Sequence, residues 1–312
     1  MNNSRTIALC TDTHLWYGSS NYVAKDGRTQ LQAASTEIQA ALFDSLFDPA
    51  RDLGQHKTPD LLIHLGDWSC GGGSFNMPFE DFCAVQQAAK EAFCALPCPV
   101  YALPGNHDCP AGGDYSLFAQ LWGTQPGIGQ TVDLPEARLV LLNTHGHSPE
   151  QLADAYPGDP ISGWVNEREL QRFEEALATV GTRPVILFTH QLLMPWVGEP
   201  EWQELYQVDN REEVLRLMAR YANVRAVFQG HAHMLNLQTC TIGGNACTFV
   251  VCPSLIEYPL AWLKLSLTAD ALAVSLQRLP LPALAQVSRN SGPGQAWRIG
   301  REEWYNFSIA LR

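Results

Sequence analysis

Residues 100–108 read VYALPGNHD, four residues typical of a β-strand followed by a turn and three polar side chains. The apolar and β-branched residues up to Leu103 favour a buried strand, and the proline and glycine that follow end it. The polar group Asn106, His107 and Asp108 is therefore expected at the edge of a sheet, where side chains can converge on a ligand. This stretch predicts a strand, a loop and a candidate site in one unit.

Four shorter blocks share this composition and setting. They are Asp12-Thr13-His14, Gly66-Asp67, Thr189-His190 and Gly230-His231-Ala232-His233. Four of the five blocks follow a run of apolar residues that favours a strand, so their polar side chains are expected at one edge of one sheet. Each block alone is a weak signal, but the shared placement predicts a single site.

The rest of the chain alternates short apolar runs with longer amphipathic stretches, which indicates a layered α/β domain. Strands are expected over residues 6–10, 61–65, 100–103, 139–142, 185–189 and 224–229. A helix is expected over 166–177, where Leu170, Phe173 and Leu177 repeat at the spacing of one buried face, and another around 214–221.

The pattern changes after Gly230. Strand-like pieces at 235–241, 246–251, 260–267 and 272–279 are joined by turn residues. They predict an antiparallel segment, expected to form a second sheet packed on the first. Residues 280–294 are rich in Pro, Ser and Gly. We therefore expect one domain over 1–279 and a tail over 280–312 that docks on this domain or on a second subunit, which makes a homodimer one expected assembly.

Composition and charge bound the class of protein. The 312 residues are 46% hydrophobic and 17% charged, as in ordinary globular proteins. A formal charge of -12 opposes binding to long nucleic acids, whereas a small anionic ligand remains compatible if metal ions supply positive charge. The first expected strand leaves no room for a secretory signal, and no apolar run approaches the roughly 20 residues of a membrane span. We expect a cytoplasmic protein without a membrane partner.

The residue types in the blocks point to metal binding. Asp12 and His14 lie two residues apart, so in an extended chain both side chains point the same way and can hold one ion. Asp67 can bridge two cations with its two oxygens, which places the ions ~3.5–4 Å apart, the separation used in phosphoryl transfer. Mixed carboxylate and imidazole ligands suit Mn, Fe, Zn or Co rather than Ca.

The later blocks complete two ligand shells. Asn106 can give a neutral oxygen to the second ion, and His107 beside it can aim a proton donor at the reacting group. His231 and His233 offer one imidazole to each ion, and His190 completes the second shell. The expected cofactors are therefore two divalent or trivalent metal ions.

The blocks, their order and their strand-loop setting resemble the calcineurin-like metallophosphoesterase family, and within it the bacterial class III cyclic nucleotide phosphodiesterases. The resemblance covers roughly residues 7–251. It implies a four-layer α/β/β/α sandwich of two mixed sheets flanked by helices, so that residues 1–279 form a metallophosphoesterase domain. It also implies a dinuclear metal site at the carboxyl ends of the strands and hydrolysis of a small phosphate ester.

The resemblance assigns every ligand position. One ion would be held by Asp12, His14, Asp67 and His233, and the other by Asp67, Asn106, His190 and His231. His107 matches the family histidine that donates to the phosphate or the leaving group, and Asp108 would orient its loop.

A phosphodiesterase of the cyclic nucleotide type is the favoured function. A hydroxide bridging the ions would attack phosphorus in line, because metal binding lowers the pKa of water to near ~7. The alternatives are a phosphomonoesterase, a pyrophosphohydrolase of nucleotide-linked substrates and, from another class, a non-catalytic scaffold of the same fold. A scaffold would be expected to have lost ligands, whereas every ligand position here is filled.

Three departures from the family concern substrate choice. Residues 68–73 lack the acidic residue that many relatives carry there, His190 is followed by Gln191 rather than a second histidine, and the segment 15–30 is long. That segment holds aromatic residues with Lys25 and Arg28, which could stack a base or grip a phosphate, or could pack on one another.

Other residues near the blocks have both functional and structural interpretations. The group after His190, namely Met194, Trp196, Trp202 and Tyr206, is a second candidate wall of the pocket. His145 and His147 form a further H-x-H pair with a structural role or a contact to substrate or ligands. His64 is expected to be a hydrogen-bonded core residue.

Overall fold

The computed structural model describes residues 4–15, 35–47, 58–72, 77–155, 160–202 and 204–312. The expected segment 15–30, with Lys25 and Arg28, lies almost entirely outside these residues. None of the helices in the described ranges is long and apolar enough to cross a membrane.

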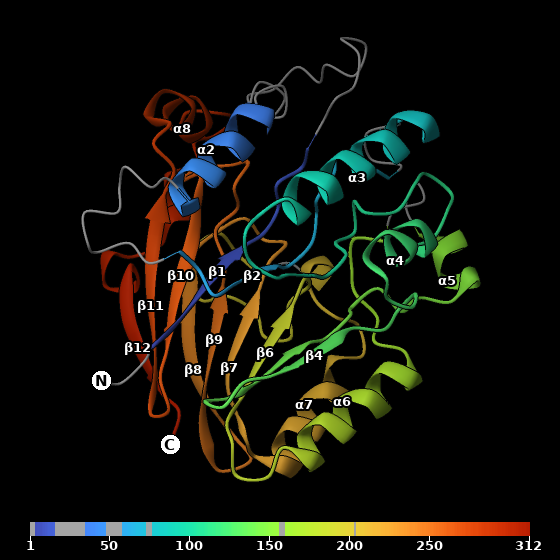
Figure 1. Ribbon diagram of the computed structural model, residues 1–312. Coiled ribbons are helices and arrows are strands. Elements are labelled where there is room, and N and C mark those ends of the chain that lie inside the picture. Colours follow the sequence, from blue (N-terminus) through green and yellow to red (C-terminus); the bar gives the residue numbers. More distant parts are fainter. Residues whose placement is uncertain (1–3, 16–34, 48–57, 73–76, 156–159, 203) are drawn as a thin grey trace.

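Two six-stranded sheets form the centre of the molecule (Figure 1). The first has the order β12-β11-β10-β1-β2-β3, with strands Asn306–Ala310, Ala271–Arg278, Ala261–Leu267, Arg5–Cys10, Leu61–His64 and Val100–Ala102. The second has the order β4-β5-β6-β7-β9-β8, with strands Gln130–Asp133, Arg138–Leu141, Val185–Thr189, Val224–Gln229, Asn245–Val251 and Asn236–Ile242.

Alternating side chains of β1 explain why the sheets stack. Ile7 and Leu9 point into a core shared with Phe188 and Phe228 of the second sheet, whereas Ala8 points to the opposite face. Both faces of the strand are therefore buried, which is why its residues from Ile7 to Cys10 are all apolar.

Helices cover the outer face of each sheet. The first sheet carries α2 (Ser35–Phe47), α3 (Phe79–Cys94), α4 (Ser116–Trp122) and α8 (Pro282–Arg289), and the second carries α6 (Glu167–Thr179) and α7 (Arg211–Tyr221). A shorter helix, α5, spans Pro149–Asp154. Figure 1 shows the two helical layers on opposite sides of the paired sheets. The expected four-layer α/β/β/α sandwich is thus confirmed.

Helix α6 shows how its boundary arises. Asn166 is its N-cap, with the side chain accepting a hydrogen bond from the N–H of Glu169 at 2.9 Å. Phe173 and Leu177 are buried against the second sheet, as their spacing predicts.

Two expectations about the sheets are wrong. The strands after Gly230 do not form a sheet of their own: β8 and β9 extend the second sheet, whereas β10 returns to pair with β1 and β11 pairs with β10 in the first sheet. The predicted strands at the blocks also divide between both sheets. Apolar runs buried on two faces carry no signal for which neighbour they pair with, so sequence pattern cannot assign them.

The C-terminal segment takes part in the sandwich. Strand β12 pairs antiparallel with β11, and Trp304, Ile309 and Leu311 lie in the core between the sheets. Docking of this segment on a second subunit stays a prediction.

Candidate metal centre

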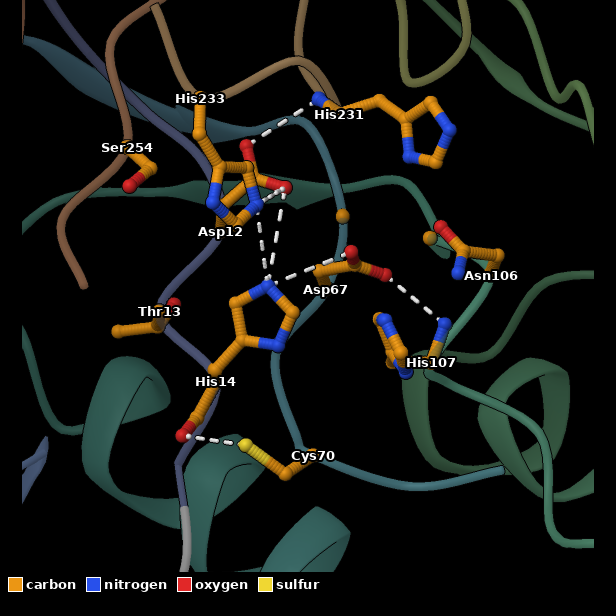
Figure 2. A network of polar contacts seen from close by, with 12 residues as sticks. Asp12, Thr13, His14, Asp67, Cys70, Asn106, His107, His231, His233 and Ser254 are labelled. Carbon is orange, nitrogen blue, oxygen red and sulfur yellow. Dashed lines mark hydrogen bonds and ion pairs between the residues drawn. The ribbon is translucent and has the colours of Figure 1, made fainter. Parts of the chain in front are cut away.

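The five sequence blocks lie at or directly after the ends of β1, β2, β3, β6 and β7. Figure 2 shows side chains from the loops after β1, β2, β3 and β7 gathered in one place. The loops after β1 and β2 are joined directly, because the Asp12 N–H donates to Gly66 O at 2.9 Å and the His14 N–H donates to Asp67 O at 3.0 Å. The site is therefore assembled from the carboxyl ends of parallel strands, which is the usual place for ligands in α/β sheets.

Five of the predicted ligand residues have a left-handed backbone. The φ angles are 55° at Asp12, 44° at His14, 57° at Asp67, 66° at His231 and 52° at His233. A side chain in this region costs roughly 1–2 kcal/mol, and such residues concentrate at functional sites. The extended backbone expected between Asp12 and His14 is therefore wrong, although the two side chains do reach the same place.

The first cluster consists of Asp12, His14, Asp67 and His233, whose potential ligand atoms all lie within 4.8 Å of one another. All four side chains are buried. His233 Nε2 lies 3.1 Å from Asp12 Oδ1, and His14 Nε2 lies 3.4 Å from Asp67 Oδ2. Figure 2 shows these side chains turned toward one another.

The second cluster consists of Asp67, His190 and His231, again within 4.8 Å. Asn106 joins it, since its Oδ1 lies 3.3 Å from His190 Nε2. Asp67 is common to both clusters: its Oδ2 lies 3.5 Å from His190 Nε2, while its Oδ1 accepts the N–H of His107 at 2.9 Å. One oxygen of Asp67 thus faces both clusters, where we expected each oxygen to face one ion.

Hydrogen bonds on the far side of two imidazoles set which nitrogen faces the clusters. His190 donates from Nδ1 to Leu65 O at 3.1 Å, and His233 donates from Nδ1 to Glu257 Oε2 at 2.7 Å. Each ring therefore presents Nε2 to its cluster, which is the arrangement that prepares an imidazole to bind a metal.

Burial and neighbouring charge shift the pKa values of the site. Burial lowers the pKa of His231 to about 3 and that of His14 well below its usual value, so both are neutral. Burial opposes charge on His233 too, but Asp12 and Glu257 beside it raise its pKa to about 9. His233 therefore carries a proton between two carboxylates, and a metal cation can replace that proton.

The arrangement fits a pair of metal ions. Buried His231 Nε2 has no hydrogen-bond partner among the described residues. His14 Nε2 and His233 Nε2 lie only 3.3 Å apart, so a shared cation satisfies both lone pairs. The described clusters therefore resemble a dimetal site with mixed nitrogen and oxygen donors, which suits first-row metals.

His107 lies beside the shared carboxylate. Its ring is 5.0 Å from the ring of His14, and its Nδ1 lies 3.1 Å from Gly71 O, to which it donates. It is absent from both clusters, which leaves it in place to contact a group held there.

Asp108 connects two of the loops through hydrogen bonds. Its fully buried carboxylate accepts the N–H groups of Gly105 at 2.8 Å and Trp68 at 3.0 Å, and the Gln86 amide at 2.8 Å. The carboxylate therefore ties the loops after β2 and β3 together, the orienting role that the sequence suggested.

His64 is a buried, hydrogen-bonded core residue. Gly66 N–H donates to its Nδ1 at 3.1 Å, so its Nε2 carries the proton and bonds the hydroxyl of Thr13. Its ring stacks on Trp68 at 3.7 Å. His64 thus connects the first two blocks without facing the clusters.

A cavity of about 990 Å³ adjoins the second cluster. Tyr115, His145 and His147 line it, together with apolar residues such as Leu117 and Leu152. His145 stacks on Tyr115 at 4.5 Å, and its ring lies 5.8 Å from that of His190. Neither ring nitrogen of buried His145 has a hydrogen-bond partner among the described residues.

The aromatic residues after His190 contact one another, and whether they form a wall of the substrate pocket stays a prediction. Trp196 contacts Trp202 and Tyr206 with ring centroids 4.7 and 5.3 Å apart, and Tyr206 lies 5.1 Å from the ring of His231. Met194 is not part of this group, because it packs into the core under α6 and α7.

Sequence reasoning missed Glu257 and Arg298. Glu257 bonds His233 as described above, and Arg298 lies 3.0 Å from Glu257. Neither residue belongs to a motif block, so no local pattern identifies them.

Comparisons with known proteins agree with this geometry. A family model for calcineurin-like phosphoesterases matches residues 5–235. The chain is 25% identical over 273 residues to a probable cyclic nucleotide phosphodiesterase of Synechococcus sp., covering 85% of this chain and 88% of that one. It is 25% identical over 190 residues to a glycerophosphodiester phosphodiesterase of Enterobacter lignolyticus, covering 59% of each.

The fold is also found in a solved structure. A dimetal phosphatase from Danio rerio superposes with a TM-score of 0.66 at 15% identity, covering 99% of both chains. The resemblance inferred from the motif blocks is confirmed by the family model. The chain belongs to the calcineurin-like phosphoesterase family and is a hydrolase of phosphoric esters.

Proposed function

We propose that the chain is a phosphodiesterase that uses two metal ions to hydrolyse a small phosphate diester, with 3',5'-cyclic nucleotides as the leading substrates. The observation that carries the proposal is Asp67 Oδ2, which lies 3.4 Å from a histidine of one buried cluster and 3.5 Å from a histidine of the other. The similarity to probable cyclic nucleotide phosphodiesterases supports the substrate class.

The ligand assignment is the one inferred from sequence. Asp12, His14, Asp67 and His233 would hold one ion, and Asp67, Asn106, His190 and His231 the other. Bound there, the two ions supply positive charge to the phosphoryl oxygens and lower the pKa of coordinated water to near ~7.

The protein's own contribution centres on His107. Gly71 fixes Nδ1 of its ring, and the backbone N–H is fixed by Asp67, so the side chain is held beside the clusters. We assign its Nε2 to donate a proton to the departing oxygen, a general-acid contribution of about 10²–10⁴-fold. The cavity lined by Tyr115, His145 and His147 would receive the organic group of the ester.

Purified protein reconstituted with Mn²⁺ should hydrolyse bis(p-nitrophenyl) phosphate, and Asn106→Ala should lose most of this activity. His107→Ala should lose about 10²–10⁴-fold on alkyl diesters, but much less on p-nitrophenyl esters, whose leaving group needs little protonation. Metal content measured in each variant separates loss of ions from loss of the acid.

Absence of turnover with every divalent metal tried would refute the proposal. A uniform loss in His107→Ala across both leaving groups would exclude the acid role alone. Comparison of cyclic AMP, p-nitrophenyl phosphate, ADP-ribose and CDP-alcohols would then distinguish a diesterase from a monoesterase or a pyrophosphohydrolase.

A further inference from the structure

A buried chain of three side chains links the C-terminal segment to the first cluster. Arg298 Nη2 lies 3.0 Å from Glu257 Oε2, and the same oxygen accepts the Nδ1–H of His233 at 2.7 Å. The side chains of Glu257 and Arg298 are only 3% and 11% exposed. Because the opposite nitrogen of His233 faces Asp12 at 3.1 Å, the chain ends at a predicted metal ligand.

Arg298 also holds the backbone of the loop that carries His233. Its Nη1 donates to the carbonyl oxygens of His233 at 3.0 Å and Ala232 at 3.2 Å. The Leu235 N–H donates to Arg298 O at 2.7 Å, which fastens the loop from its other end. These bonds act where His233 has a φ of 52°, so they oppose relaxation of a left-handed backbone.

The chemistry of the chain suits a metal ligand. A carboxylate on the far nitrogen of an imidazole fixes the tautomer, orients the ring and makes the near nitrogen a stronger donor. Burying the Glu257 carboxylate would be costly without a partner, and Arg298 supplies the compensating charge. His190 has only a neutral carbonyl, Leu65 O, in the equivalent position, so the two clusters are supported differently.

We propose that Glu257 and Arg298 are positioning residues that set the metal affinity of the site formed by Asp12, His14, Asp67 and His233. The C-terminal segment is then a functional part of the metal centre and not only an edge of the sheet. This inference rests on the metal centre proposed above.

The test measures Mn²⁺ binding directly, by calorimetry on protein first stripped with a chelator. Glu257→Gln keeps the shape but removes the charge, and Arg298→Ala removes the guanidinium. Each substitution should lower the Mn²⁺ affinity of one of the two sites by about 10–100-fold, the usual effect of losing such a supporting group. Arg298→Lys should fall between Arg298→Ala and the wild type, since a lysine can pair with Glu257 but cannot also bind both carbonyls.

Arg301→Ala is the matched control, because Arg301 lies in the same segment with its side chain 62% exposed. Its guanidinium lies 3.9 Å from Glu303 and 5.0 Å from the centre of the Trp304 ring, and neither of these residues belongs to a cluster. It should leave both affinities unchanged. Combining Glu257→Gln with His14→Ala should add little, because both act on the same ion, whereas combining it with Asn106→Ala should weaken both ions.

Folding is checked by the melting temperature of the stripped protein, and Glu257→Gln carries the test if Arg298→Ala does not fold. Wild-type affinity in folded Glu257→Gln would overturn the inference, as would an equal loss in Arg301→Ala. Failure of the wild type itself to bind Mn²⁺ would instead refute the metal centre, so the two failures are distinguishable.

Discussion

At the scale of single residues, the metal centre combines ligand chemistry with unfavourable backbone. His231 has a φ of 66°, a region that glycine adopts freely and that costs other residues roughly 1–2 kcal/mol. Two effects of replacing His231 on stability can therefore be separated: loss of the imidazole and relief of the backbone strain. In the metal-free protein, His231→Gly should be more stable than His231→Ala by about 1 kcal/mol, measured by urea unfolding in the presence of chelator.

The control uses another predicted ligand whose backbone is ordinary. His190 is not among the described residues with positive φ, so there the order should reverse and Ala should be more stable than Gly by about 0.5–1 kcal/mol. Both pairs remove an imidazole, so only the backbone differs between them. Equal stability of the two His231 variants would show that the left-handed backbone carries no cost there.

At the scale of elements, the loops after β2 and β3 lie so close together that there is no room for a side chain at position 105. A Cβ atom added to Gly105 would lie 2.1 Å from Asp67 Oδ1 and 2.3 Å from the Asp67 backbone nitrogen. Gly105→Ala should therefore displace the shared carboxylate of Asp67, weaken the binding of both ions and abolish most activity. The crowding should also lower the free energy of unfolding by about 1–3 kcal/mol.

Gly112→Ala is the comparison for this substitution. An added Cβ there meets nothing within 4 Å, but φ is +66°, so a loss of about 1 kcal/mol is expected with no change in metal binding. Metal titration of both variants distinguishes the two effects. Normal Mn²⁺ affinity in Gly105→Ala would mean that Asp67 does not need this loop in place.

The elements themselves were largely predictable from sequence, whereas their pairing was not. Strands β6 and β7 have the expected bounds, because β-branched residues between turn signals are a local pattern. By contrast, β10 pairs with β1 from the far end of the chain, and strands buried on both faces give no hint of their neighbours. Glu257 could not be predicted either, because its contact with His233 arises only in the folded chain and Glu257 belongs to no motif.

At the scale of the whole molecule, the proposed metal centre would join the two sheets. Asp12, His14, Asp67 and Asn106 follow strands of the first sheet, whereas His190, His231 and His233 follow strands of the second. Each predicted ion thus has ligands from both sheets. Ions held in this way bind only the folded state, so each ion should stabilise it by about 2.7 kcal/mol at a concentration 100 times its dissociation constant.

The melting temperature should therefore rise when Mn²⁺ replaces chelator, and the rise should shrink both in Asp12→Asn, from the first sheet, and in His190→Ala, from the second. His147→Ala is a suitable control, because this histidine lines the neighbouring cavity and belongs to neither cluster. Its variant should keep the full rise. If either ligand variant kept it as well, the ions would not depend on ligands from both sheets, and the centre could not act as the link between them.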